Sequence, residues 1–156
     1  YQAALESWRA LAPRARLLDG VRAAAAQAHF GQGESARAAL QTAPPTTPAA
    51  RAIADARLAA ATAHYRATLG HGDKGWSAAA LFRLGEVPAT YASALALQAL
   101  PSATAEEAEG LRARMTGLRG EATTALRRCL RFARRSGVDS PWTRQAEDLL
   151  RQIAPR

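Results

Sequence analysis

Three histidines are the side chains of this sequence best suited to bind a metal ion or to exchange a proton near neutral pH. They are His29, His64 and His71. None has a second histidine four residues away, the spacing that places two ligands on one face of a helix. His71 and Asp73 share a glycine-rich stretch, where an aspartate more often supports a turn than holds a metal. We therefore expect no metal centre and no cofactor.

Residues that could act as a nucleophile or as an acid–base pair are few. Cys129 is the one cysteine, which excludes an intrachain disulfide and a cysteine metal cluster. Its place among apolar residues favours a buried, unreactive thiol. Glu106, Glu107 and Glu109 lie together at the start of an expected helix, where carboxylates offset the helix dipole. Without a paired base or a phosphate-binding loop, the pattern predicts a protein that is not an enzyme.

Arginine is the residue type with the clearest functional pattern. Arg83 and Glu86 flank Leu84 and Gly85, and further arginines line the exposed sides of a long helix. These further candidates for partner binding are Arg127, Arg128, Arg131, Arg134 and Arg135. They fit an anionic partner, such as an acidic peptide, lipid headgroups or an envelope polymer. The alternative, more common for runs of charge, is a solvated face whose cations suit the C-terminal end of a helix dipole.

The net charge leaves these interpretations open. The 156 residues include 21 basic and 13 acidic side chains, a formal net charge of +8. The excess lies in the C-terminal part, where 11 arginines and four acidic residues follow position 109, and Lys74 is the only lysine. Nucleic acid is a third partner class, but no aromatic residues alternate with the arginines to stack on bases, and no helix-turn-helix signature is present.

A long helix over residues 105–136 is expected to organise the fold. Thr104 and Glu107 form a capping-box pattern, and Ser136 with Gly137 marks the other end. Between them, small or apolar residues recur in alternating steps of four and three, the pattern of one narrow helix seam. The seam residues are Leu111, Met115, Leu118, Ala122, Ala125, Cys129 and Phe132. One helix cannot bury such a seam alone, so neighbouring helices must lie along it.

The remaining residues predict further helices, about seven in all, in an all-α fold without the residue runs typical of strands. We expect a turn at Gly31–Gly33, and Pro88 should kink or split its helix. Trp8, Trp76 and Trp142, each near a helix start, are expected to be packing residues. The other expected helices cover residues 1–11, 13–30, 34–42, 48–69, 76–100 and 141–154. Short turns between them imply antiparallel neighbours.

Two stretches resemble degenerate tetratricopeptide repeats, in which an aromatic, a Leu-Gly pair and small residues let two helices nest. The first contains Tyr65, Gly72, Asp73, Trp76, Ala79, Ala80, Leu81, Arg83, Leu84, Gly85 and Glu86. The second contains Ala125, Leu126, Ala133, Gly137, Val138, Trp142, Ala146 and Leu149. In the order of these parts, residues 57–155 are similar to the C-terminal part of large tetratricopeptide-type proteins of bacterial cell envelopes, including gliding-motility proteins. Pro88 departs from the family pattern, which has an aromatic or polar residue there.

The resemblance implies antiparallel hairpins stacked as a right-handed α-solenoid. The length fits one domain, residues 1–156, or one section of a longer array. Its parts would be N-terminal hairpins in 1–43, a repeat-like hairpin in 48–100, and the long and last helices in 104–154. The resemblance also implies a periplasmic or envelope-associated location, with the cytoplasm as the alternative. The chain begins at Tyr1 rather than at a methionine, as in a mature chain or a fragment, and no apolar run approaches membrane-spanning length.

Two functions follow from these features. The first is a non-enzymatic scaffold of a multi-protein bacterial envelope assembly, which binds a peptide or partner helix on a concave helical face. The alternative is a basic helical module that docks on an anionic surface, either membrane lipid or nucleic acid. Salt would distinguish them, because binding to phosphates falls steeply with salt whereas binding of an apolar peptide does not.

Overall fold

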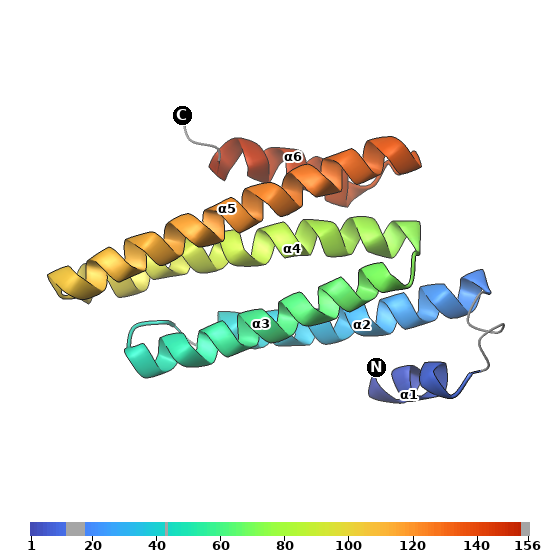
Figure 1. Cartoon of the computed structure of the whole chain (residues 1–156), viewed down its shortest axis with the longest axis horizontal. Helices are drawn as coiled ribbons and strands as arrows, with labels where there is room; N and C mark the ends of the chain where they lie inside the picture. The colour runs from blue at the N-terminus through green and yellow to red at the C-terminus, as the bar shows by residue number, and fades with distance from the viewer. Residues whose placement is uncertain (12–17, 43, 154–156) are drawn as a thin grey trace.

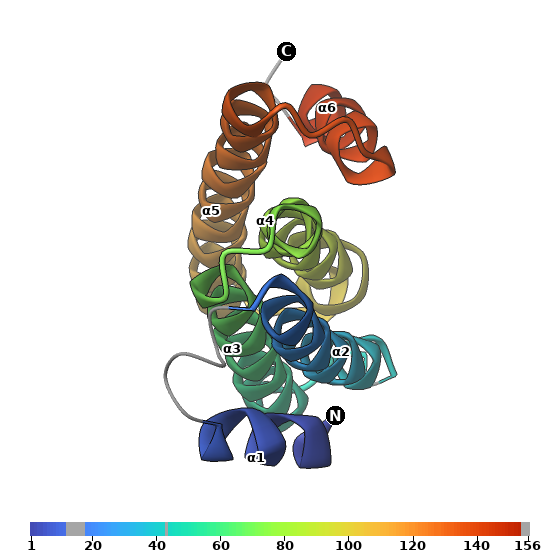
Figure 2. The ribbon, with the colours of Figure 1, turned by 90° about the vertical axis from the view of Figure 1, so that its right-hand side faces the viewer.

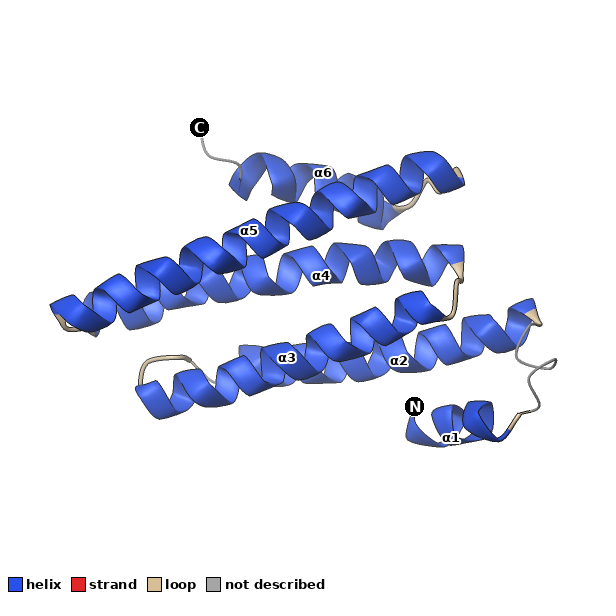
Figure 3. Ribbon diagram, viewed as in Figure 1, coloured by secondary structure: helices blue, strands red, loops and turns tan. Residues whose placement is uncertain are grey.

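The computed structural model describes residues 1–11, 18–42 and 44–153. This part of the chain forms six α-helices and no strand, which confirms the all-α class (Figure 3). Pro13, predicted in a first helical turn, and Pro155, predicted to end the last helix, lie outside the described residues. The helices are α1 Gln2–Ala10, α2 Asp19–Gln41, α3 Pro48–Gly70, α4 Lys74–Ala94, α5 Ala105–Ser136 and α6 Pro141–Ile153. A π-helical turn, Leu95–Ala99, and a 3₁₀ turn, Leu100–Ser102, lead from α4 toward α5.

The helices form two closely packed pairs (Figures 1 and 2). Helix α2 packs along α3, and α4 packs along α5. The two pairs meet where α4 contacts α3 and α2. Helix α6 folds back onto α5 and α4, while α1 lies against α2 at the opposite end of the stack. Helix α4 is therefore the central element, with neighbours on several sides and twelve buried residues of its own.

The expected turn at Gly31–Gly33 is wrong, because these residues lie inside the continuous helix α2. The second and third expected helices are thus one helix, which reduces the expected seven to six in the described part of the chain. The glycines are needed for close approach rather than for a turn. A Cβ atom on Gly31 would lie 2.1 Å from the ring of Tyr1, and one on Gly33 would lie 2.6 Å from the ring of Tyr65.

Helix α5 has both of its predicted ends. Thr104 Oγ1 accepts a hydrogen bond from the backbone N–H of Glu107, at 3.3 Å. The Glu107 carboxylate accepts one in return from the backbone N–H of Thr104, at 3.0 Å. This reciprocal capping box satisfies two backbone donors at the N-terminus. Gly137 ends the helix in the left-handed conformation, at φ 66°, which glycine adopts without steric cost.

The buried seam of α5 includes the predicted Cys129 and follows the prediction without exception as far as Ala122. Beyond it, Leu126 and Ala133 are buried, while the predicted Ala125 and Phe132 are only partly buried. The seam thus repeats every eleven residues instead of every seven, close to the 3.6-residue turn of a straight helix. The complete set of buried residues is Ala108, Leu111, Met115, Leu118, Ala122, Leu126, Cys129 and Ala133.

Gly85 of the Leu-Gly pair brings α4 and α5 together. A Cβ atom there would lie 2.5 Å from Leu126 Cγ and 3.1 Å from the backbone oxygen of Ala122. Helix α4 also continues through Pro88, which is buried, so the chain does not split at that proline. The close approach of α4 and α5 creates the floor and one wall of the groove described below.

Aromatic residues fill the centre of the core. Phe30 lies 5.5 Å from Tyr65, 5.2 Å from Trp76 and 6.2 Å from Trp142, measured between ring centroids. Trp76 and Trp142 are partly buried against the core, so the prediction that they are packing residues is confirmed. Offset and tilted ring contacts at these distances stabilise the fold beyond the area they bury.

Candidate functional site

Helices α3 and α5 lie on the same side of α4 (Figure 2), and residues of these three helices line a series of hollows between them. The N-terminal parts of α3 and α5 are joined by two ion pairs. Arg51 Nη2 lies 3.3 Å from Glu107 Oε1, and Arg114 Nη2 lies 2.9 Å from Asp55 Oδ1. Beyond these pairs the two helices diverge toward their C-terminal ends (Figure 1). We call the resulting surface feature the α3–α5 groove.

Three successive hollows make up the α3–α5 groove, with volumes of about 270, 430 and 370 Å³. Thr62, Arg66 and Glu121 belong to both the first and the middle hollow. Leu81 and Arg128 belong to both the middle and the last hollow. Because neighbouring hollows share lining residues, they form one continuous depression. The last two have volumes within the range of ligand clefts, about 300–1,000 Å³.

Charge changes along the α3–α5 groove. The first hollow is lined by two cations and two carboxylates, of which Asp55 and Arg114 pair with each other. The middle hollow has two cations and the single carboxylate of Glu121. The last hollow has three cations, Lys74, Arg128 and Arg135, and no acidic residue. The groove is thus electrically balanced at its ion-paired end and positive at its wide end.

The five arginines predicted on α5 lie on two sides of its exposed surface. Arg128 and Arg135 line the groove, and their spacing of seven residues places both on one side of the helix. Arg127, Arg131 and Arg134 are also exposed but line none of the three hollows. The structure therefore separates one predicted set into groove residues and outer-face residues.

Arg83 and Glu86, the other two predicted contact residues, belong to a charge cluster around Glu34. Glu34 accepts hydrogen bonds from Tyr65 Oη at 2.5 Å, Arg37 Nη2 at 3.0 Å and Arg83 Nη2 at 3.2 Å. Arg83 Nη1 donates to Glu86 Oε2 at 2.8 Å. The side chains of Arg83 and Glu86 are only 13% and 24% exposed. Their charges are thus already compensated within the protein.

The packing of the Arg83 side chain also indicates that this residue interacts within the protein. Its Cζ atom lies 5.0 Å from the centroid of Trp142 and 5.5 Å from that of Phe82, within cation–π range. Its Nε atom is buried, and it lies 3.0 Å from Glu34 Oε1 without the geometry of a hydrogen bond. A side chain held by two rings and two carboxylates is fixed in place, so Arg83 acts mainly in the structure of the fold.

Burial, hydrogen bonds and nearby charges shift the pKa values of Glu34 and Tyr65 in this cluster. Burial raises the pKa of the Glu34 carboxyl, but hydrogen bonds from Tyr65 and Arg37 and the charge of Arg83 lower it more, to below its usual value. Burial and the hydrogen bond to Glu34 raise the pKa of Tyr65. The cluster therefore contains an ionised carboxylate and a neutral phenol at neutral pH.

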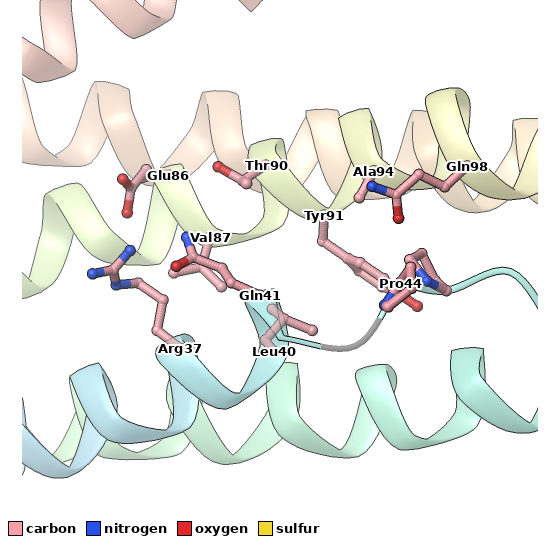
Figure 4. Close-up of a pocket in the computed structure, with 11 residues that line it drawn as sticks. Arg37, Leu40, Gln41, Pro44, Glu86, Val87, Thr90, Tyr91, Ala94 and Gln98 are labelled. Atoms are coloured by element: carbon pink, nitrogen blue, oxygen red, sulfur yellow. The ribbon is translucent and has the colours of Figure 1, made fainter.

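A separate hollow, outside the α3–α5 groove, has a volume of about 310 Å³ and lies between α2 and α4 (Figure 4). Arg37 and Glu86 are at one end of it, so it borders the Glu34 cluster. Burial raises the pKa of Tyr91, which lines the hollow, to about 12. The remaining lining residues are Leu40, Gln41, Pro44, Pro45, Val87, Thr90, Ala94 and Gln98. With its two charged residues of opposite sign at one end, this α2–α4 hollow shows no charge preference for a ligand.

The three histidines lie together, which sequence spacing did not predict. The ring centroids of His29 and His71 are 5.2 Å apart, and those of His29 and His64 are 6.2 Å apart. Trp8 contacts His71 edge-on at 4.9 Å. His64 and His71 are seven residues apart, a spacing that could have indicated one side of α3, but His29 comes from a different helix.

The environment of His29 and His71 favours their neutral forms. Burial lowers the pKa of His71. Burial, followed by the charges of His71, His64 and Arg9, lowers the pKa of His29. His29 Nδ1 is buried without a hydrogen-bond partner. Within the described ranges, no three histidine, cysteine or acidic side chains are placed to hold a metal ion.

Cys129 is buried, as predicted from its place on the α5 seam. Its thiol donates a weak hydrogen bond to the backbone oxygen of Ala78, with 3.6 Å between Sγ and the oxygen. Burial raises the pKa of the thiol to about 11. The reactive thiolate form is therefore scarce at neutral pH.

Comparisons of this chain with protein-family models, with curated proteins and with solved structures found no match. Among the described residues, no helix is both long enough and apolar enough to cross a membrane.

Proposed function

We propose that this chain is a non-enzymatic protein-interaction module that receives a segment of a partner protein in the α3–α5 groove. The observation that carries the proposal is that α3 and α5 are tied together by ion pairs at one end and diverge along α4 beyond it. Three connected hollows follow the line of divergence. A long depression of this kind suits a chain segment better than a small, enclosed substrate.

The floor of the α3–α5 groove gives such a segment apolar surface to bury. Leu84 and Ala125 line the middle hollow and keep part of their apolar surface exposed, next to the buried Leu81 and Pro88. Burying apolar area is the main favourable contribution to most protein associations. The floor comes from α4, which is held by neighbours on several sides, so the binding surface is formed before a partner arrives. A preformed surface reduces the entropy lost on binding.

On the resemblance of residues 57–155 alone, we extend the proposal to a scaffold of a multi-protein bacterial envelope assembly. In that interpretation the chain is a tetratricopeptide-like section of a helical solenoid. Stacked helical hairpins offer long concave surfaces to partners, and the elongated form of the α3–α5 groove supports this interpretation.

Docking on an anionic surface is the second candidate function. Arg127, Arg131 and Arg134 favour it, because they are exposed on α5 outside the three hollows. A planar bilayer reaches such an outer face more easily than the floor of a groove. If this candidate is correct, replacing these three arginines with glutamate will abolish binding to anionic vesicles and leave peptide binding intact.

The proposed function can be tested without knowing the partner. A display library of random peptides of about twelve residues is selected against the intact chain, and bound peptides are measured by fluorescence anisotropy. We then fill the groove with Thr124→Trp, because Thr124 is exposed and lines the middle hollow. Thr116→Trp is the matched control, since this threonine is also exposed on α5 and lines none of the three hollows.

We expect Thr124→Trp to weaken binding of the selected peptides by about tenfold or more, and Thr116→Trp to leave their affinity within about twofold. Circular dichroism confirms that both variants are folded. If the selection yields no binder, or if both variants weaken binding equally, the groove is not the binding site and the proposal is wrong.

A further inference from the structure

We propose that the partner segment held in the α3–α5 groove is acidic and carries a large apolar side chain, which enters the last hollow while its carboxylates face the cations around it. This inference rests on the proposed function and adds the chemistry of the occupant. It concerns the wide end of the groove, lined by the end of α3, the start of α4 and the C-terminal part of α5.

The first argument is the absence of internal partners for the cations. Lys74, Arg128 and Arg135 line the last hollow and are exposed. Neither they nor Arg66 of the middle hollow form an ion pair with any residue that the structure describes. Their charges are therefore available to an external carboxylate, and a complementary partner gains both specificity and association rate.

The second argument is the apolar floor of the last hollow. Leu69 and Phe132 line it and are only partly buried against the core, next to the fully buried Leu81. A purely charged ligand would leave this apolar surface in contact with water. An apolar side chain between acidic residues covers it and places carboxylates at the rim, so both features of the hollow are satisfied by one segment.

The third argument is the change of charge along the groove. At the ion-paired end, Asp55 forms an ion pair with Arg114, and Glu121 adds a negative charge near the middle of the groove. Acidic residues of a partner would gain no net attraction at the balanced end and would be attracted at the wide end. The occupant is therefore expected to carry its acidic residues at the end that lies beside α4's first turn, and uncharged residues toward Asp55.

The shape of the site disfavours other anionic partners. Cations line a concave hollow, and a flat membrane surface meets the rim of a hollow more readily than the side chains that line it. Phe132, the one aromatic ring in the last hollow, is partly buried, whereas nucleic-acid grooves present exposed rings on which bases stack. A peptide segment satisfies both the depth and the charge.

The test compares four labelled probes on the intact chain. Two peptides share the same apolar residues taken from the selected binders, one with glutamate and aspartate at its other positions and one with glutamine and asparagine. The other two probes are phosphatidylserine-containing vesicles and a single-stranded oligothymidylate. Each is measured at low and at physiological salt, because charge pairing weakens as salt rises.

Two double variants with the same change in net charge locate the binding. Arg128→Gln with Arg135→Gln removes charge from the groove, and Arg127→Gln with Arg134→Gln removes it from the outer face of the same helix. We expect the acidic peptide to bind best and to lose about tenfold or more in affinity in the groove variant. The outer-face variant should lose less than about threefold.

Each other outcome overturns the inference. Equal losses in both double variants would show attraction to net charge without a site. Stronger binding of vesicles or of the oligonucleotide than of the acidic peptide would assign the cations to another partner class. Equal binding of the neutral peptide would refute the inference yet leave the proposed function standing, provided that Thr124→Trp still weakens that peptide.

Discussion

The Glu34 cluster and the wide end of the α3–α5 groove both place arginines between helices, but they use them differently. In the cluster, Arg83 is 13% exposed and contacts two carboxylates. At the wide end, Arg128 and Arg135 are exposed and form no ion pair with a described residue. The comparison teaches that the charge of an arginine does not indicate its role. Its role is indicated by whether carboxylates of the same protein compensate that charge.

The largest expected effect is the loss of the carboxylate at the centre of the cluster. Glu34→Gln keeps the shape but leaves Arg37 and Arg83 without their common anion, so we expect the free energy of unfolding to fall by about 2–3 kcal/mol. Urea denaturation followed by circular dichroism measures it. Glu147→Gln, on the exposed face of α6, is the control and should change stability by less than about 0.5 kcal/mol. Equal losses would mean that the cluster does not stabilise the fold.

A smaller effect on stability is expected when the pH is lowered. Because the folded-state pKa of Glu34 lies below its ordinary value of 4.5, the ionised carboxylate contributes stability that is complete above that value and is lost as the pH falls through the folded-state pKa. The stability difference between the wild type and Glu34→Gln should therefore shrink below pH 4.5. Urea titrations of both proteins at several pH values measure it. A difference that stays constant down to the pH of acid unfolding would contradict this linkage.

The smallest expected effect is at the wide end of the groove. Arg128→Gln with Arg135→Gln removes two charges that have no internal partner, so stability should change by no more than about 0.5 kcal/mol, while binding of the acidic peptide is lost. The same urea titrations, on this variant and on Glu34→Gln, place the two regions on one scale. A loss at the groove as large as that at the cluster would erase the distinction between them.

Much of the fold could be predicted from local sequence signals. The caps at Thr104 and Gly137, and the Thr47 cap whose side chain accepts a hydrogen bond from the N–H of Ala50, are contained in a few neighbouring residues. The seam of α5 was correct at every residue up to Ala122 and at Cys129, and wrong at Ala125 and Phe132. There a strict seven-residue repeat departs from the natural turn of the helix, which rotates by about 20° per heptad relative to it.

The errors came from contacts between distant residues. Gly31 and Gly33 have the composition of a turn, and only the rings of Tyr1 and Tyr65 packed against them explain a continuous helix. The candidate site likewise depends on contacts between residues that are distant in the sequence. The sequence indicated the arginines of α5, but which of them line a groove depends on α3 and α4. Glu34, the partner of Arg83, is 49 residues away from it in the chain.

The two ion pairs that join α3 to α5 lie at one end of the groove, so the width at the other end depends on the angle between the two helices. Asp55 and Arg114 fix the separation of the helices at one point, and α3 continues for fifteen residues beyond Asp55 to its end at Gly70. At 1.5 Å per residue this arm is about 22 Å long. One degree of rotation about the ion-paired point would move the far end of α3 by about 0.4 Å, so the angle between α3 and α5 affects the width of the groove far more at its open end than at the ion pairs.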